Sequence, residues 1–119
     1  MTARILVVDD QVAVREVLGA MLELAGYEVQ QASNGREAMD ALASADYDLM
    51  LLDVNLPGQS GWSILEQARS AAPGLPVLMI SDERYEDEAL QRGAVAFLAK
   101  PYRRSALEDA VRDALVVTA

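Results

Sequence analysis

The sequence predicts a single α/β domain in which a parallel β-sheet lies between two layers of helices. Short apolar runs alternate five times with segments of helical spacing. We interpret the runs as strands that are apolar on both faces, which is typical of a sheet covered by helices on each side. Right-handed crossovers then give an open, doubly wound, three-layer (βα)5 sandwich. A length of 119 residues suits one domain, so we expect residues 1–119 to form a single unit.

The five expected strands are short, within the usual length of strands in globular proteins. Each expected strand is followed by an expected helix. The strands are expected at residues 5–8, 27–31, 49–52, 77–80 and 95–98.

The first two helices are indicated by spacing and by the residues at their ends. Gly26 is expected to end the first helix, because glycine readily adopts the left-handed backbone found after helix C-termini. Asn34 and Glu37 resemble a capping box that opens the second helix. The apolar face of the first helix is expected to consist of Val14, Val17, Leu18, Met21, Leu22 and Ala25.

Three further helices follow from similar signals. Ser60 is expected to cap the third helix, and Pro73 lies beyond its end. The fourth helix is short, roughly residues 83–92, and ends at Gly93. Ser105 and Glu108 are interpreted as a capping box before the fifth helix. The expected apolar faces are Ile64, Leu65 and Ala68 in the third helix, and Leu107, Ala110, Val111, Ala114 and Leu115 in the fifth.

The composition disfavours several classes of function. A net charge of −9 disfavours direct binding to nucleic acid or to an anionic membrane surface. The chain has no cysteine and no histidine, so it lacks thiol chemistry and the commonest metal ligand and near-neutral base. No apolar run is long enough to span a membrane, and the N-terminus has no signal-peptide pattern. We therefore expect a cytoplasmic protein.

Four of the five expected strands are followed by a charged or hydroxyl residue. The C-terminal ends of parallel strands lie at one edge of the sheet, where open α/β sheets bind their ligands. Residues far apart in the sequence are therefore expected to converge on one patch. They are the pair Asp9 and Asp10, then Asp53, Ser81 and Lys100.

This set of side chains is suited to phosphoryl transfer. Carboxylates held close together repel one another unless a cation lies between them, and oxygen ligands suit Mg²⁺. A carboxylate can also accept a phosphoryl group as an aspartyl-phosphate. Positive charge on the phosphoryl oxygens would come from Mg²⁺ and from Lys100, the only lysine of the chain, while Ser81 offers a hydroxyl. Proline after Lys100 biases that lysine away from helical backbone.

Simpler explanations exist for most of these residues taken singly. Asp10 could cap the first helix, and Ser81 or Asp82 could cap the fourth. Lys100 could be an ordinary surface lysine. Asp53 is harder to explain in this way, because the sequence VNLPG follows it and no helix starts there.

The motifs resemble those of the receiver domain of two-component response regulators, over nearly the whole chain. They are an acidic pair after the first strand, Asp-x-x-Leu-Pro-x-x-x-Gly after the third, a hydroxyl residue after the fourth and Lys-Pro after the fifth. The resemblance implies a flavodoxin-like fold with strand order 2-1-3-4-5. In this sequence the motifs are Asp9 with Asp10, then Asp53 with Leu56, Pro57 and Gly61, then Ser81, and Lys100 with Pro101.

The resemblance also implies roles for single residues. Asp53 would be the phosphoacceptor, and Lys100 would pair with the phosphoryl group. Asp10 and Asp53 would bind Mg²⁺ directly. Asn55 would offer its backbone carbonyl to the metal, and Asp9 would assist through a water molecule.

Other residues would belong to the switch between inactive and active states. Ser81 would follow the phosphoryl group, and Phe97 would be the aromatic residue whose rotamer reports the active state, although plain core packing explains Phe97 almost equally well. The bond between Lys100 and Pro101 would be cis. Trp62 is a candidate spectroscopic reporter, or an ordinary packing residue of the third helix.

The function implied is phosphorelay signal transduction. The phosphoryl group would come from a phosphohistidine on a sensor histidine kinase or a histidine phosphotransfer protein, and this chain has no histidine of its own. The new charge would draw Ser81 inward and bias an interaction surface near the fourth helix and fifth strand. The downstream partner would be a separate protein target or a fused output domain.

The sequence departs from the family pattern after the fourth strand. Asp82 stands where the family mostly has a small residue, so it either restricts access to the site or caps the fourth helix and points away; we favour the cap. The segment between Ser81 and Lys100 is about one helical turn shorter than is usual in the family.

Two other functions compete with this interpretation. A Mg²⁺-dependent phosphohydrolase with Asp53 as nucleophile would need a second aspartate two residues later, where this chain has Asn55. A receiver-like binding module that is never phosphorylated is the other alternative. The presence of the acidic pair, Asp53, Ser81 and Lys100 together argues against such a module. We therefore expect a phosphorylated signalling module, not an enzyme.

Overall fold

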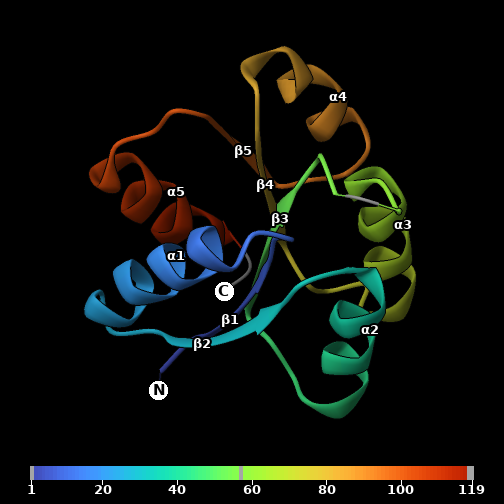
Figure 1. Ribbon diagram of the computed structural model, residues 1–119, viewed down its shortest axis with the longest axis horizontal. Helices are drawn as coiled ribbons and strands as arrows, with labels where there is room; N and C mark the ends of the chain where they lie inside the picture. Colours follow the sequence, from blue (N-terminus) through green and yellow to red (C-terminus); the bar gives the residue numbers. More distant parts are fainter. Residues whose placement is uncertain (1, 57, 118–119) are drawn as a thin grey trace.

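The computed structural model describes residues 2–56 and 58–117, and forms one sheet with helices on both of its faces (Figure 1). The strands are parallel, and their order in the sheet is β2-β1-β3-β4-β5, as the resemblance implied. The strands are β1 (Arg4–Val8), β2 (Glu28–Ala32), β3 (Leu49–Asp53), β4 (Val77–Ser81) and β5 (Ala96–Ala99).

Figure 1 shows α1 and α5 on one side of the sheet and α2 and α3 on the other. Each face therefore has its own apolar core, which confirms the predicted three layers. One core is formed with Leu18 and Leu22 of α1 and Leu107 of α5; the other includes Ile64 and Leu65 of α3. The helices are α1 (Val12–Leu24), α2 (Gly35–Ser44), α3 (Gly61–Ala71), the 3₁₀ helix η1 (Glu83–Tyr85), α4 (Glu86–Gln91) and α5 (Arg104–Val117).

Most of the predicted helix ends are confirmed. Gly26 has a φ of 98°, and the amide of Tyr27 donates to the carbonyl of Leu22, so a left-handed residue closes α1. The Asn34 side chain accepts a hydrogen bond from the amide of Glu37 at 2.8 Å. Ser60 likewise caps α3 by accepting from the amide of Ser63.

Two helix predictions are wrong in detail. The fifth helix begins at Arg104, so Ser105 lies inside it and is not its cap; Glu108 instead forms an ion pair with Arg104 at 3.1 Å. The fourth helix is divided into η1 and α4, because Asp82 caps a 3₁₀ turn first.

The edge strand β2 also differs from the prediction. It begins one residue later than expected, and Glu28, Gln30 and Gln31 are exposed. An edge strand with a partner on one side only is not covered like the central strands, which explains its polar sequence. On α1, Val17 was expected on the buried face but is 53% exposed. No helix in the described part of the chain has the length and apolarity needed to cross a membrane.

Candidate functional site

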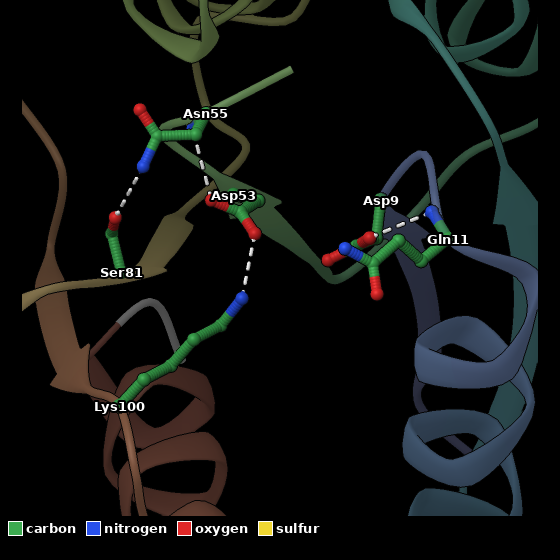
Figure 2. A network of polar contacts seen from close by, with 6 residues as sticks. All are labelled: Asp9, Gln11, Asp53, Asn55, Ser81 and Lys100. Atoms are coloured by element: carbon green, nitrogen blue, oxygen red, sulfur yellow. Dashed lines mark hydrogen bonds and ion pairs between the residues drawn. The ribbon is translucent and has the colours of Figure 1, made fainter. Parts of the chain in front are cut away.

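The site lies where the strands of the sheet end. Asp53 is the last residue of β3 and Ser81 the last of β4, while Asp9 and Lys100 directly follow β1 and β5. The register pairs β3 with β1 and β4, and β4 with β5, so these ends are neighbours in the sheet. The predicted convergence of distant residues is therefore confirmed for Asp53 and Lys100, which touch (Figure 2).

Asp53 is buried, with 7% of its surface exposed, and both of its carboxylate oxygens have partners. Oδ2 accepts from the Lys100 ammonium at 2.7 Å, and Oδ1 accepts from the amide of Asn55 at 2.9 Å. Figure 2 shows Lys100 reaching toward Asp53 from the end of β5. The carboxylate is thus oriented by its own loop on one side and neutralised by the lysine on the other.

Lys100 is not a free surface lysine. Its amide donates to the carbonyl of Ser81 at 2.8 Å, and the following bond to Pro101 is cis, as the resemblance implied. Burial by itself would lower the pKa of Lys100. The hydrogen bond to Asp53 and the charges of Asp53 and Asp9 outweigh it, so the pKa lies above its ordinary value of 10.5. The ammonium group is therefore fully charged near neutral pH.

Asp9 is the second buried acid of the site, with 4% of its surface exposed. Its Oδ1 accepts from the amide of Gln11 at 2.9 Å. Burial raises the pKa of Asp9 above its ordinary value of 3.8; the Gln11 amide lowers it, and the charge of Asp53 raises it again. A cation beside Asp9 and Asp53 would offset both the cost of burying the Asp9 charge and its repulsion by Asp53.

Asp10 lies outside this buried group. Its side chain is exposed, and it makes no hydrogen bond within the described residues 2–56 and 58–117. It does not cap α1, since the N-cap residue is Gln11, so that simpler explanation is wrong.

Ser81 and Asn55 lie beside the carboxylate of Asp53. Ser81 is 1% exposed, and its hydroxyl oxygen accepts from the side-chain amide of Asn55 at 3.3 Å. Ser81 does not cap a helix, because the cap of η1 is Asp82. The hydroxyl proton of Ser81 therefore remains available for an acceptor at the site.

The surroundings of Gly61 explain why the motif that follows β3 has a glycine at this position. Its amide donates to the carbonyl of Val54 at 2.8 Å, so the start of α3 lies directly against the end of β3. A Cβ atom at this position would overlap the carbonyl oxygen of Asp53 and lie 2.7 Å from the Cα of Val54. Pro57 of the same motif lies outside the described residues.

The oxygen groups at this edge fit Mg²⁺ by type. Two buried carboxylates face each other, a third is exposed next to them, and Mg²⁺ prefers one or two carboxylates with water and phosphate oxygens. Within the residues that the structure describes, no three acidic side chains are already gathered around one point.

The remaining predicted residues lie on β5, between β4 and η1, and on α3. Phe97 is partly buried and packs against the core on the α3 side. Asp82 is exposed, and its carboxylate accepts from the amide of Arg84 at 3.0 Å, which confirms its capping role. Trp62 meets the ring of Tyr85 edge to face, with centroids 6.0 Å apart, and the guanidinium of Arg92 lies 5.0 Å from its ring.

Sequence reasoning missed two residues near the site. The half-buried Tyr102 is close enough to Lys100, Asp9 and Asp53 to feel their charges, and burial raises its pKa above 10.0. Arg15 donates to the carbonyl of Asp9 at 2.7 Å. A cation near the start of a helix is disfavoured by the helix dipole, and that was the available signal for Arg15.

Comparison of the sequence with known proteins identifies relatives of this chain. The family model for the response regulator receiver domain matches residues 5–112. The response regulator MprA of Mycolicibacterium vanbaalenii is 42% identical over 92% of this chain and 47% of its own length. The probable transcriptional regulatory protein SilR of Salmonella typhimurium is 36% identical over 94% of this chain and 50% of its own length. The chain thus spans about half the length of these two relatives.

Solved structures agree with the sequence comparison. The chemotaxis response regulator CheY4 of Vibrio cholerae superposes with a TM-score of 0.87 at 30% identity, covering 96% of this chain and 99% of its own.

Proposed function

The chain belongs to the response regulator receiver domain family, and from this premise we propose that it accepts a phosphoryl group on Asp53. Receiver domains of this family serve phosphorelay signalling and generally bind Mg²⁺. The single observation that best supports the proposal for this chain is the contact of 2.7 Å between the Asp53 carboxylate and the Lys100 ammonium. It brings the nucleophile and a fixed positive charge together at the sheet edge.

The transfer proceeds from a phosphohistidine on a partner. A carboxylate oxygen of Asp53 attacks phosphorus, the bond between phosphorus and the imidazole nitrogen breaks, and the imidazole leaves with the electron pair. The ammonium group of Lys100, which contacts Oδ2 before the reaction, then forms an ion pair with the phosphoryl oxygens. The Ser81 hydroxyl, already held by Asn55, donates to one of these oxygens.

The metal ligands we propose are Asp10, Asp53 and the backbone carbonyl of Asn55, with Asp9 acting through water. When bound, Mg²⁺ supplies positive charge for the transferring phosphoryl group. The buried, mutually repelling pair of Asp9 and Asp53 supports a cation at this place.

Phosphorylation is proposed to act as a switch through Ser81 and Phe97. Ser81 ends β4 and is followed within two residues by η1, so a displacement of Ser81 is transmitted to η1 and α4. Phe97 lies on β5 and packs against the same core as Ala89 of α4. The surface near α4 and β5 is therefore the part whose partner affinity would change.

The partners proposed are a sensor histidine kinase or a histidine phosphotransfer protein, and a downstream protein target or fused output domain. Receiver domains as a class interact with sensor kinases and output domains. Residues 1–119 would act as one receiver module within this exchange. We also propose that the chain acts in the cytoplasm, without direct contact to nucleic acid or membrane.

We propose a signalling role without catalytic turnover. A phosphohydrolase would need an acid two residues after the nucleophile, and Asn55 offers only an amide, which donates to Ser81. The pairing of the Lys100 ammonium with the buried Asp53 carboxylate supports a phosphorylated module over one that is never phosphorylated.

The test is phosphorylation by a small acyl phosphate in the presence of Mg²⁺, followed by intact-mass spectrometry. The wild-type protein is expected to gain one phosphoryl group, and Asp53→Asn to gain none, because the amide is not a nucleophile of comparable strength. Asp40→Asn is the matched control, since Asp40 is exposed on α2. Uptake of the label by Asp53→Asn would refute the assignment.

A further inference from the structure

Arg15 links three parts of the structure behind the acidic end of β1. It lies on α1, but its side chain turns back, and Nη1 donates to the main-chain carbonyl of Asp9 at 2.7 Å. Nε donates to the side-chain oxygen of Gln31 on β2 at 3.3 Å. One half-buried guanidinium thus joins α1, β2 and the loop between β1 and α1.

The loop at residues 9–11 is held at Asp9 from several directions. The amide of Asp9 donates to the carbonyl of Ala32 at 3.2 Å, and its carboxylate accepts from the amide of Gln11. Within the described part of the chain, Arg15 provides the one side chain from outside this loop that hydrogen-bonds to it. The peptide that Arg15 holds leads directly into Asp10, whose own side chain is exposed and has no such anchor.

The location of Arg15 is electrostatically unfavourable for an isolated helix. A cation near a helix N-terminus opposes the helix dipole, and α1 has no acidic residue in its first turn to offset it. A surface arginine would turn its charge into water, whereas Arg15 directs it at a neutral carbonyl next to two buried carboxylates. The arrangement is that of a group that orients metal ligands without touching the metal.

We propose that Arg15 is a positioning residue of the phosphoryl-transfer site, which holds the backbone of Asp9 so that Asp9 and Asp10 are preorganised for the metal. The proposal rests on the function proposed above. The fork of the guanidinium is essential to it, because one planar group must reach both the Asp9 carbonyl and Gln31.

Two effects of removing Arg15 have opposite signs, which makes the test sharp. In Arg15→Gln a positive charge is lost, and charge alone would make Mg²⁺ bind more tightly. Loss of the hydrogen bond from Arg15 to the Asp9 carbonyl would make Mg²⁺ bind more weakly. We expect the second effect to dominate and the dissociation constant for Mg²⁺, measured by titration calorimetry, to rise about tenfold, as when a group supporting a metal ligand is lost.

Arg69→Gln is the matched control. Arg69 also donates through Nη1 to a main-chain carbonyl, that of Arg92 at 2.9 Å, but it lies on α3, which covers the other face of the sheet (Figure 1). This variant removes the same charge and the same type of bond, and we expect it to leave Mg²⁺ affinity unchanged. Arg15→Lys loses the fork but keeps the charge, so it lacks the gain that charge removal gives Arg15→Gln, and its Mg²⁺ affinity should be no higher than that of Arg15→Gln.

Two further readouts separate positioning from general destabilisation. The Mg²⁺ concentration for half-maximal phosphorylation by a small acyl phosphate should rise in Arg15→Gln, while the rate at saturating Mg²⁺ falls less. Amide exchange of Gln11 should be faster in Arg15→Gln than in wild type without added Mg²⁺, because the loop is less well held. A structural role elsewhere would change neither.

The outcomes distinguish this proposal from the proposed function. If Arg15→Gln binds Mg²⁺ as tightly as wild type or more tightly, Arg15 is not a positioning residue and the proposal is overturned. If the wild-type protein binds no Mg²⁺ and takes up no phosphoryl group, the proposed function itself fails. Weaker binding in Arg15→Gln, with Arg69→Gln unchanged, supports the proposal.

Discussion

The two buried aspartates of the site are oriented by the same local device. Oδ1 of Asp9 accepts from the amide of Gln11, and Oδ1 of Asp53 accepts from the amide of Asn55, in each case two residues along the chain. Such turns are a property of short acidic side chains and need no distant partner. The local turn uses one oxygen of each carboxylate, and the second oxygen of Asp53 accepts from Lys100.

Gly61 is a residue whose side chain cannot be enlarged without moving Asp53. In Gly61→Ala the added Cβ would overlap the Asp53 carbonyl oxygen and lie 2.7 Å from Val54 Cα, both of which are backbone atoms. We expect the free energy of unfolding, measured by urea denaturation, to fall by about 1–3 kcal/mol, as in other overpacked positions. The rate of phosphorylation should fall as well, since the carboxylate is displaced.

Gly74→Ala is the control for this substitution. An added Cβ at Gly74 meets no atom within 4 Å, so its stability should be equal to or slightly above that of the wild type. Equal stability of Gly61→Ala and Gly74→Ala would contradict the steric explanation.

Asp82 is a cap in the structure, and its removal should affect stability more than the site. Its carboxylate accepts from the amide of Arg84, so Asp82→Ala should cost about 1 kcal/mol of stability, the usual value for an N-cap. Mg²⁺ affinity, measured by calorimetry, should stay at the wild-type value. Trp62 fluorescence is unsuitable here, because Trp62 contacts Tyr85 of the same 3₁₀ helix. A large change in Mg²⁺ affinity would place Asp82 in the site.

At the scale of elements, the start of α2 carries a pH-dependent contribution to stability. Glu37 accepts hydrogen bonds at 2.7 Å from both the hydroxyl and the amide of Ser33. The Ser33 hydroxyl is the main cause that lowers the pKa of Glu37 below its ordinary value of 4.5. A carboxyl group with a lowered pKa stabilises the fold above its unfolded pKa, and this contribution is lost as the pH falls through the folded pKa.

Glu37→Gln should therefore be less stable than the wild type at neutral pH, and the difference should shrink as the pH falls below about 4.5. Urea denaturation over a series of pH values measures it. Ser33→Ala keeps the Glu37 charge but removes the hydroxyl donor, so its pH dependence should be weaker than in wild type. Parallel curves for wild type and Glu37→Gln through this range would rule out the linkage.

The short fourth helix is attached to α3 at both ends. Tyr85 of η1 contacts the Trp62 ring, and the C-cap residue Arg92 lies over the same ring while its carbonyl accepts from Arg69. Ala89 is the buried residue of α4 and packs in the same core as Phe97 of β5, and the contacts with α3 add to this packing at the two ends of the helix. Trp62 is thus well placed to report movements of η1 and α4.

At the scale of the whole molecule, the site exists because one sheet aligns four chain segments. Its groups come from Asp9, Asp53, Ser81 and Lys100, which lie far apart in the sequence and meet only when β1, β3, β4 and β5 are neighbours. The central strands are buried on both faces by two separate cores, and this double cover holds the strand ends in register.

Much of this arrangement could be predicted from the sequence. Apolar runs and caps located five strands, and the polar residues after four of them identified the edge at which Asp53 and Lys100 meet. The errors have local causes. Ser105 matched a capping box but lies inside α5, and β2 is more polar than a covered strand because it lies at the sheet edge. Propensity and spacing do not report where in the sheet a strand lies.

The sequence by itself determined which residues follow each strand, and hence the chemical nature of the site: carboxylates, a hydroxyl and a single lysine. Only the tertiary structure decided that Asp9 is buried while Asp10 is exposed, and that Arg15 turns back to the Asp9 carbonyl. The physical reason is that strand and helix patterns depend on neighbours along the chain, whereas burial and side-chain direction depend on what packs against them from elsewhere in the fold.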